Sequence, residues 1–150
     1  MAWHVHTVNF SMKISQLIML IPLLTLLGCA GQRPDNLGIQ NGQFAACPDS
    51  PNCVSSFDAR DSHGIEPIAG SLSRIKDVLS TMDRVNIVED QDNYLYAEFT
   101  SRLIGYVDDV EFLADPASNQ VHVRSASRLG HSDMGVNRKR IEEIRSAVGN

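Results

Sequence analysis

The chain has 150 residues and is acidic, with 13 Lys and Arg side chains against 18 Asp and Glu and a net charge of −5 at pH 7. This balance, together with the compartment predicted below, argues against binding of nucleic acids through their phosphates. About 120 residues follow Cys29, which is enough for one domain with one hydrophobic core but too few for two.

An apolar run occupies residues 14–27, directly after Lys13, and its last two residues begin the tetrapeptide LLGC that ends at Cys29. The run is shorter than the roughly 20 apolar residues of a spanning helix, and Pro22 interrupts it. A positive start, a short apolar stretch and a small residue before a cysteine are typical of a bacterial secretion signal. The tetrapeptide resembles the lipobox of lipoproteins.

We therefore predict a lipoprotein-type signal peptide over residues 1–28, with Met12 as its more natural start. The thiol of Cys29 then receives diacylglycerol and attaches the mature chain to a membrane. Ala30 stands where an aspartate would retain a lipoprotein at the inner membrane, so resemblance to sorting in diderm bacteria predicts the periplasmic face of the outer membrane. The alternatives are an uncleaved signal anchor and an ordinary signal peptide with a chance cysteine.

Residues 29–46 contain few apolar side chains and predict a tether between the membrane and the domain. Cys47 and Cys53 follow, and in an oxidising compartment this pair predicts a structural disulfide. A redox-active pair is the alternative, although the spacing differs from the Cys-x-x-Cys of thiol oxidoreductases. An irregular arm over residues 54–70 leads into a single domain that we place at residues 47–150.

A helix is predicted over residues 71–82, where apolar side chains recur at helical spacing and Ser71 can cap the first turn. Four extended segments follow, at residues 84–89, 94–101, 109–114 and 120–125.

A last helix is predicted from about residue 134 or 136 to 148, with Ser132 or Asp133 as its cap. Its buried stripe comprises Val136, Ile141, Ile144 and Val148. The economical arrangement is an α+β domain, a four-stranded antiparallel sheet with two helices on one face, plus the irregular N-terminal arm stapled by the disulfide.

Charge is unevenly distributed along this chain. Residues 29–117 carry six basic and fifteen acidic side chains, whereas residues 118–150 carry six basic and three acidic ones. A local basic cluster of this kind can hold a small anion or a lipid headgroup.

The densest polar segment joins the last strand to the last helix. Gly130 and Gly135 allow backbone conformations that aim N–H groups at a ligand, and Arg138 and Arg140 fall in the first turns of a helix, where the dipole repels cations. We predict an anion-binding site, made by Arg124, Ser125, Ser127, Arg128, Asn137 and Arg138. The alternative is a structural network in which the arginines pair internally, with Asp108, Asp109, Glu111 and Asp133.

No catalytic motif is found, and the histidines show no metal-ligand spacing, so neither a cofactor nor a metal is expected. An enzyme would have to use His131 or the pair Asp108 and Asp109 as acid–base groups on a substrate held by the arginines.

Five motifs occur in a fixed order: CPDSPNCVSS at residues 47–56, DDVEF at 108–112, VRSASR at 123–128, SDMGVNR at 132–138 and RIE at 140–142. In this combination the chain resembles the domain-of-unknown-function 1499 family, from about Cys47 to Arg145. The resemblance implies a small domain found in bacterial lipoproteins, membrane-attached proteins and plastid relatives, with no established activity.

The expected function is non-catalytic binding of an anionic small molecule, a lipid headgroup or an envelope protein, on a membrane to which Cys29 is attached. The enzyme described above and a purely structural interaction module are the alternatives.

Overall fold

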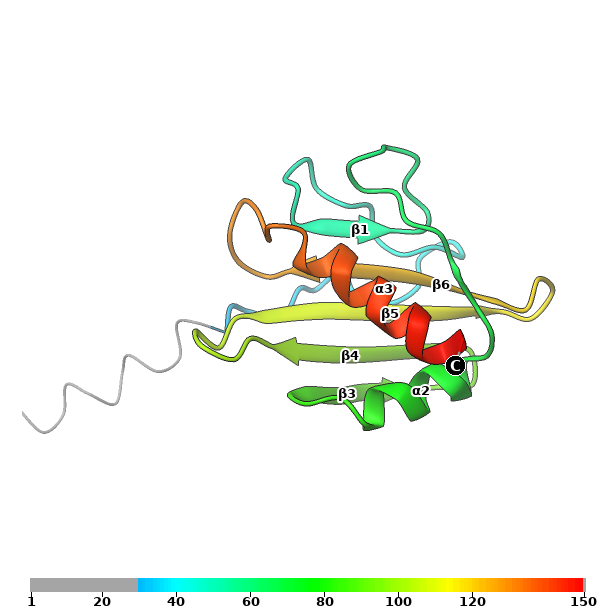
Figure 1. Ribbon diagram of the computed structural model, residues 1–150. Coiled ribbons are helices and arrows are strands. Elements are labelled where there is room, and N and C mark those ends of the chain that lie inside the picture. Colours follow the sequence, from blue (N-terminus) through cyan, green and yellow to red (C-terminus); the bar gives the residue numbers. More distant parts are fainter. Residues whose placement is uncertain (1–29, 150) are drawn as a thin grey trace, which may run out of the picture.

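The computed structural model describes residues 30–149 (Figure 1). The predicted signal peptide and Cys29 lie outside these residues. Within them, neither helix has the length and hydropathy needed to cross a bilayer.

One antiparallel sheet forms the centre of the domain, in the order β1-β6-β5-β4-β3, with β2 also paired to β6. The four predicted strands are present as β3 to β6, but the sheet has two more, because the arm contributes the short strands β1 and β2. With three and two residues, these strands are too short to show an alternating pattern in the sequence. The strands are β1 (Cys53–Ser55), β2 (Ile68–Ala69), β3 (Val85–Asp90), β4 (Tyr94–Thr100), β5 (Val107–Asp115) and β6 (Gln120–Ser127).

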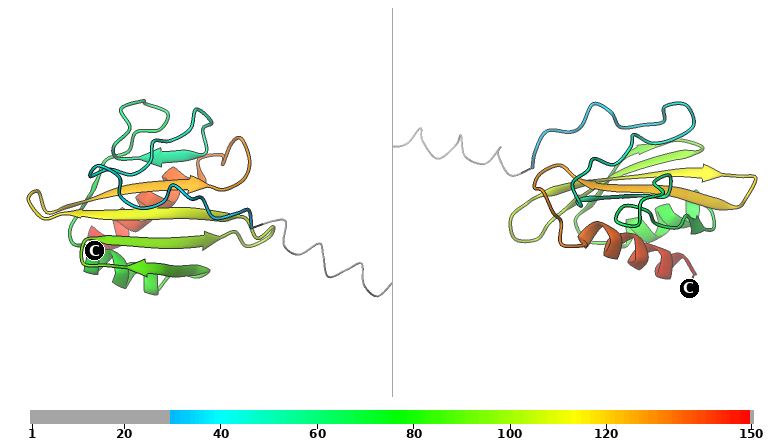
Figure 2. Two further views of the ribbon diagram at one scale, coloured as in Figure 1. Left: turned by 180° about the vertical axis from the view of Figure 1, so that it is seen from behind. Right: turned by 90° about the horizontal axis from the view of Figure 1, so that it is seen from above.

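Both helices, α2 (Leu72–Ser80) and α3 (Val136–Gly149), cover the same face of the sheet, as predicted (Figures 1 and 2). Alternate residues of the central strands point toward them, and these apolar side chains form the core. Ile75 and Leu79 of α2 meet Ile141 and Ile144 of α3 in this core, and all four are almost completely buried.

The helix starts are capped by the predicted side chains. Ser71 Oγ accepts from Arg74 N at 3.3 Å, and Asp133 accepts from Gly135 N at 2.9 Å and Asn137 N at 2.8 Å. The predicted stripe of α3 is wrong at Val136, which is 48% exposed because it is the first residue of the helix and the buried residues of α3 begin at Asn137.

The disulfide Cys47–Cys53 is present and holds the start of the arm beside the sheet. Within its loop, Asn52 Nδ2 donates to the carbonyl of Gly130 at 2.8 Å, and Asn137 Nδ2 donates to the carbonyl of Asn52 at 3.0 Å. The stapled loop is therefore fastened both to the β6–α3 loop and to the start of α3.

The other face of the sheet is covered by residues 31–44, which we call the strap (Figure 2). Phe44 is buried against Tyr94 and Tyr96 of β4, and Gly38 N donates to Glu111 Oε1 of β5 at 2.7 Å. A tether was expected at residues 29–46, but the strap, which makes up most of this segment, is packed on the domain. The reason is that Phe44 finds an apolar contact on the two tyrosines of β4.

Candidate functional site

The six residues predicted to bind an anion do not form one site. Successive side chains of a strand point to opposite faces, so β6 sends Arg124 toward the strap and Ser125 toward the helices. Arg128 joins Arg124 on the strap face, and Ser127 joins Ser125 near Asn137 on the helix face. Arg138 lies apart from both groups, beside the arm.

Arg124 is paired with a carboxylate inside the domain. Its Nη1 lies 3.1 Å from Glu111 Oε2, and the two side chains are 6% and 0% exposed. Glu111 also accepts a hydrogen bond from the hydroxyl of Tyr94 at 2.9 Å. Burial raises the pKa of Glu111, against the opposing effects of the Gly38 N–H and the Arg124 charge. Arg124 Nε is buried and has no hydrogen-bond partner among residues 30–149.

Arg128 is the centre of a second ion-pair cluster on the strap face. Its guanidinium donates to Asp109 through Nε at 3.0 Å and Nη2 at 2.7 Å, and Nη2 also pairs with Glu98 at 2.5 Å. Arg33 of the strap binds the same Glu98 at 2.6 Å and lies over the ring of Tyr96. Burial would raise the pKa of Glu98, but hydrogen bonds from the two arginines outweigh it and lower this pKa to about 2.

A third cluster lies on the helix face. Arg140 of α3 pairs with Asp108 of β5 and lies over the ring of Phe99, 4.8 Å from its centre. Its Nη1 also donates to Ser125 Oγ at 3.0 Å, and the Ser125 hydroxyl donates to Asn137 Oδ1 at 2.6 Å. Ser125 and Asn137 therefore connect α3 to the sheet.

Three of the four carboxylates named as structural partners thus hold arginines: Asp108 with Arg140, Asp109 with Arg128, and Glu111 with Arg124. Asp133, the fourth, caps α3. The residues that sequence analysis missed are the strap-face partners. These partners are Arg33, Tyr94, Tyr96 and Glu98. Three of them, Tyr94, Tyr96 and Glu98, alternate along β4, and this alternation could have predicted that they share a face of the sheet.

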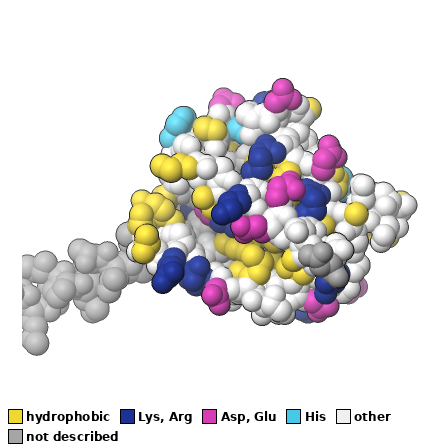
Figure 3. Space-filling view, viewed as in Figure 1, with side chains coloured by type: hydrophobic (Ala, Val, Ile, Leu, Met, Phe, Trp, Pro, Cys, Tyr) yellow, Lys and Arg dark blue, Asp and Glu magenta, His cyan; other side chains and the backbone are white. Residues whose placement is uncertain are grey.

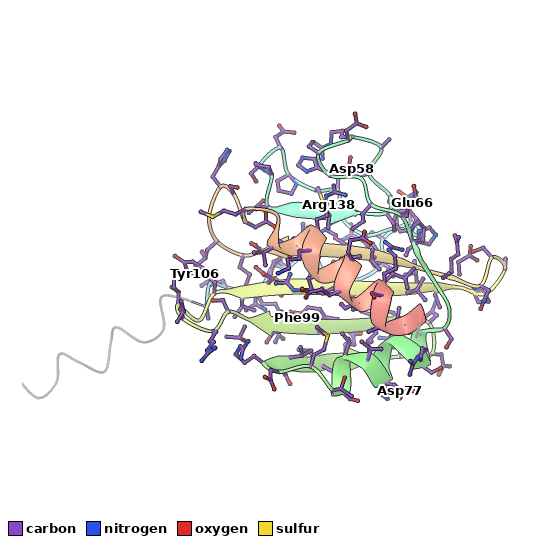
Figure 4. The ribbon with its side chains drawn as sticks, viewed as in Figure 1. Asp58, Glu66, Asp77, Phe99, Tyr106 and Arg138 are labelled. Carbon is purple, nitrogen blue, oxygen red and sulfur yellow. A yellow bond between two sulfur atoms is a disulfide. The ribbon has the colours of Figure 1, made fainter. Side chains whose placement is uncertain are left out.

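Arg138 differs from Arg124 and Arg128. Its Nη2 lies 3.4 Å from the carbonyl of Ser62 and 3.5 Å from that of Asp61, and no carboxylate between residues 30 and 149 forms a salt bridge with it. It lines a cavity of about 540 Å³ between the arm and α3, which we call the groove (Figure 4).

The groove carries both signs of charge. Arg60 is neutralised by Asp58, 2.6 Å away, and its hydrogen bonds lower the pKa of Asp58 to about 2. Asp61 and Glu66 are exposed at the groove and have no ion-pair partner in the described part of the chain. The groove therefore suits a ligand that carries both charges better than a bare anion.

The histidines and carboxylates give no assembled catalytic group. His122 Nδ1 lies 3.1 Å from Ser56 Oγ, and His63 Nδ1 lies 3.1 Å from the carbonyl of Cys53, so both rings fasten the arm to the sheet. His131 is exposed on the loop before α3. Over residues 30–149, no three His, Cys, Asp or Glu side chains lie close enough together to hold a metal ion.

Fold and site together define a small α+β domain with internally paired arginines. The chain belongs to the family described as protein of unknown function (DUF1499), whose model matches residues 43–148. This match confirms the family resemblance and begins near the end of the strap. No curated protein and no solved structure matches the chain.

Proposed function

We propose that the protein is a lipid-anchored domain of the bacterial cell envelope that binds a partner protein and catalyses no reaction. The lipobox-like tetrapeptide before Ala30 supports an anchor on Cys29, at the periplasmic face of the outer membrane. The engagement of Asp108 and Asp109 in ion pairs argues against the enzyme, since neither carboxylate is free to move a proton.

The observation that carries the proposal is the position of Arg138 in the groove. Arg124 and Arg128 are neutralised by buried carboxylates, so binding an anion there would require breaking a buried ion pair. Arg138 instead lines the groove without a carboxylate partner among residues 30–149, and Asp61 and Glu66 line the same groove. A polypeptide segment can present an acidic side chain to Arg138 and a basic one to these two carboxylates.

Photo-crosslinking in living cells tests this binding site. Benzoylphenylalanine replaces Glu142, an exposed residue of α3 that lines the groove. We expect an adduct with one envelope protein that is lost in Arg138→Glu, because this change reverses the charge at the contact. Lys139→Glu is the matched control, since Lys139 is the next residue of α3, is 78% exposed and does not line the groove.

The absence of an adduct, or an adduct that Arg138→Glu leaves unchanged, would contradict partner binding in the groove. The anchor is tested separately by Cys29→Ser, which should move the protein from the membrane fraction to the periplasmic fraction.

A further inference from the structure

Exposed apolar side chains gather at one end of the molecule. Eight large apolar residues are exposed among residues 30–149, and six of them lie on or beside two loops, the β4–β5 loop and the β6–α3 loop. Single exposed apolar residues are normal, but a cluster of them marks an interaction surface. Figure 3 shows hydrophobic side chains at this end, on the left of the view. We call five of them the apolar end: Leu103, Ile104, Tyr106, Leu129 and Met134.

The two loops are held in place beside each other. Arg128 N donates to the carbonyl of Val107 at 3.2 Å, and Ser101 and Tyr106 close the β4–β5 loop with hydrogen bonds of 2.8 and 2.9 Å. Met134, between Asp133 and Gly135, is 96% exposed and has a left-handed backbone with φ of 55°. A bulky apolar side chain is thus exposed to solvent at a position whose backbone conformation such residues rarely adopt.

The chain enters the domain at the same end. A Cβ atom placed on Gly31 would lie 2.9 Å from Arg128 Cβ and 3.1 Å from Leu129 Cγ, so Gly31 lies directly against the apolar end. Cys29 is two residues away, and two residues reach at most about 7 Å in any conformation. Since the strap is bound to the sheet through Arg33 and Gly38, it supplies no slack.

We propose that the apolar end docks directly on the lipid bilayer. The inference rests on the proposed anchor at Cys29, because a lipid attached there brings this end to the membrane surface. Leucine, isoleucine and methionine side chains then enter the boundary between headgroups and acyl chains, and Tyr106 lies at headgroup level. Arg102, exposed on the same loop, can reach the lipid phosphates.

The sequence offers a spectroscopic test, because its single tryptophan, Trp3, lies in the predicted signal peptide and is absent from the mature chain that begins at Cys29. Leu103→Trp is introduced into this chain, and the lipidated protein is reconstituted in vesicles of phosphatidylethanolamine and phosphatidylglycerol. We expect the emission to shift to the blue and to be quenched by brominated acyl chains. Ala117→Trp is the matched control, since Ala117 is exposed on the β5–β6 turn, at the opposite end of the sheet, and its emission should not change.

Equal emission from the two reporters would overturn docking while leaving the anchor in place. Failure of the anchor itself is recognised independently, because Cys29→Ser would then leave the membrane fraction unchanged. In the unlipidated Cys29→Ser form, Leu103→Glu with Met134→Glu should reduce residual partitioning into the same vesicles at least about tenfold, since two apolar side chains are lost from the contact.

Self-association is the remaining outcome that would overturn docking on a bilayer. Sedimentation velocity of the Cys29→Ser form should show a monomer at all concentrations. A dimer that Leu103→Glu dissociates would assign the apolar end to a second copy of the chain.

Discussion

At the residue scale, Glu111 has the most demanding environment of the carboxyl groups. It is completely buried, receives hydrogen bonds from Tyr94 and Gly38, and pairs with Arg124, whose Nε is left without a partner between residues 30 and 149. A buried pair of this kind contributes little compared with apolar packing, but removing one partner leaves the other charge uncompensated. Its two members should therefore be strongly coupled.

The first prediction follows from this coupling. Arg124→Met should lower the free energy of unfolding at pH 7 by about 3 kcal/mol, because Glu111 is left buried and unpaired. Adding Glu111→Gln should restore much of this loss. Urea denaturation of the two single variants and the double variant measures the coupling, and additive losses would contradict it.

The pH dependence of Arg124→Met provides a further check with a definite sign. Without the arginine, burial keeps the pKa of Glu111 above its unfolded value of 4.5. A group whose pKa is raised by folding stabilises the folded state at low pH, and this contribution is lost as the pH rises through the pKa of the folded state. The variant should therefore recover stability, relative to the wild type, as the pH is lowered from 7 toward 4.5.

Glu98 predicts the opposite behaviour, because its pKa is lowered to about 2 from 4.5. A group whose pKa is lowered by folding stabilises the folded state at pH values above its pKa in the unfolded chain. This contribution is lost as the pH falls through its pKa in the folded state. The stability advantage of the wild type over Glu98→Gln should be constant above about pH 4.5 and disappear toward pH 2. Thermal unfolding at a series of pH values measures it, and an advantage that survives at pH 2 would show that the ion pairs with Arg33 and Arg128 are not its source.

At the scale of elements, the strap is the segment whose role the structure changes most. Phe44 is 6% exposed and packs against Tyr94 and Tyr96, whereas the pair of Arg33 with Glu98 is half exposed on the arginine side. A buried aromatic ring contributes several-fold more to the free energy of unfolding than an exposed ion pair does. The strap should therefore depend on its phenylalanine.

We expect Phe44→Ala to lower the free energy of unfolding by about 3 kcal/mol and Arg33→Ala by less than about 1 kcal/mol. Denaturation of both variants tests this order. Hydrogen exchange should show faster exchange of the Gly38 amide in Phe44→Ala, since its bond to Glu111 depends on the strap lying on the sheet. If Arg33→Ala lowered the free energy of unfolding more than Phe44→Ala does, the ion pair with Glu98 and not the phenylalanine would hold the strap on the sheet.

The sequence predicts the helices and the four long strands because each shows its own hydrophobic period over several residues. It does not predict β1, β2 or the packing of the strap, since these depend on pairing with β6 and on the tyrosine-bearing face of β4, both distant in the chain. Local composition made residues 29–46 look like a tether, although the buried ring of Phe44 and the hydrogen bond of the Gly38 amide hold the strap on the sheet.

For the candidate site, the sequence identifies the residue types but not their partners. Five of the six predicted ligand residues lie on or beside ion-pair clusters, and strand alternation divides them between two faces. The register of β5 and β6, which sets Glu111 opposite Arg124, decides which carboxylate meets which arginine, and a contiguous sequence motif does not contain that register. Arg138 has no ion-pair partner among residues 30–149 because α3 places it against the arm, where its Nη2 meets the backbone carbonyls of Asp61 and Ser62.

At the scale of the whole molecule, the two proposed surfaces lie on different parts of the domain. Figure 4 shows Asp58, Glu66 and Arg138 around the groove, on the arm side of α3, and Tyr106 at the end where the chain enters. A domain that lies on a bilayer through the apolar end would therefore leave the groove open to the periplasm. The anchor, the docking end and the binding site would form one oriented arrangement.

This arrangement predicts that the two functions can be removed separately. Arg138→Glu should abolish the crosslink from position 142 and leave the quenching of Leu103→Trp unchanged, because the side chain lies outside the apolar end. Conversely, Met134→Glu should weaken the quenching while the crosslink persists, as long as the lipid on Cys29 keeps the protein at the membrane. Effects of distant residues without shared partners are additive, so the double variant should show both losses and no more. A crosslink that disappears in Met134→Glu would instead mean that partner binding requires the domain to lie on the bilayer, and the two surfaces would then act as one.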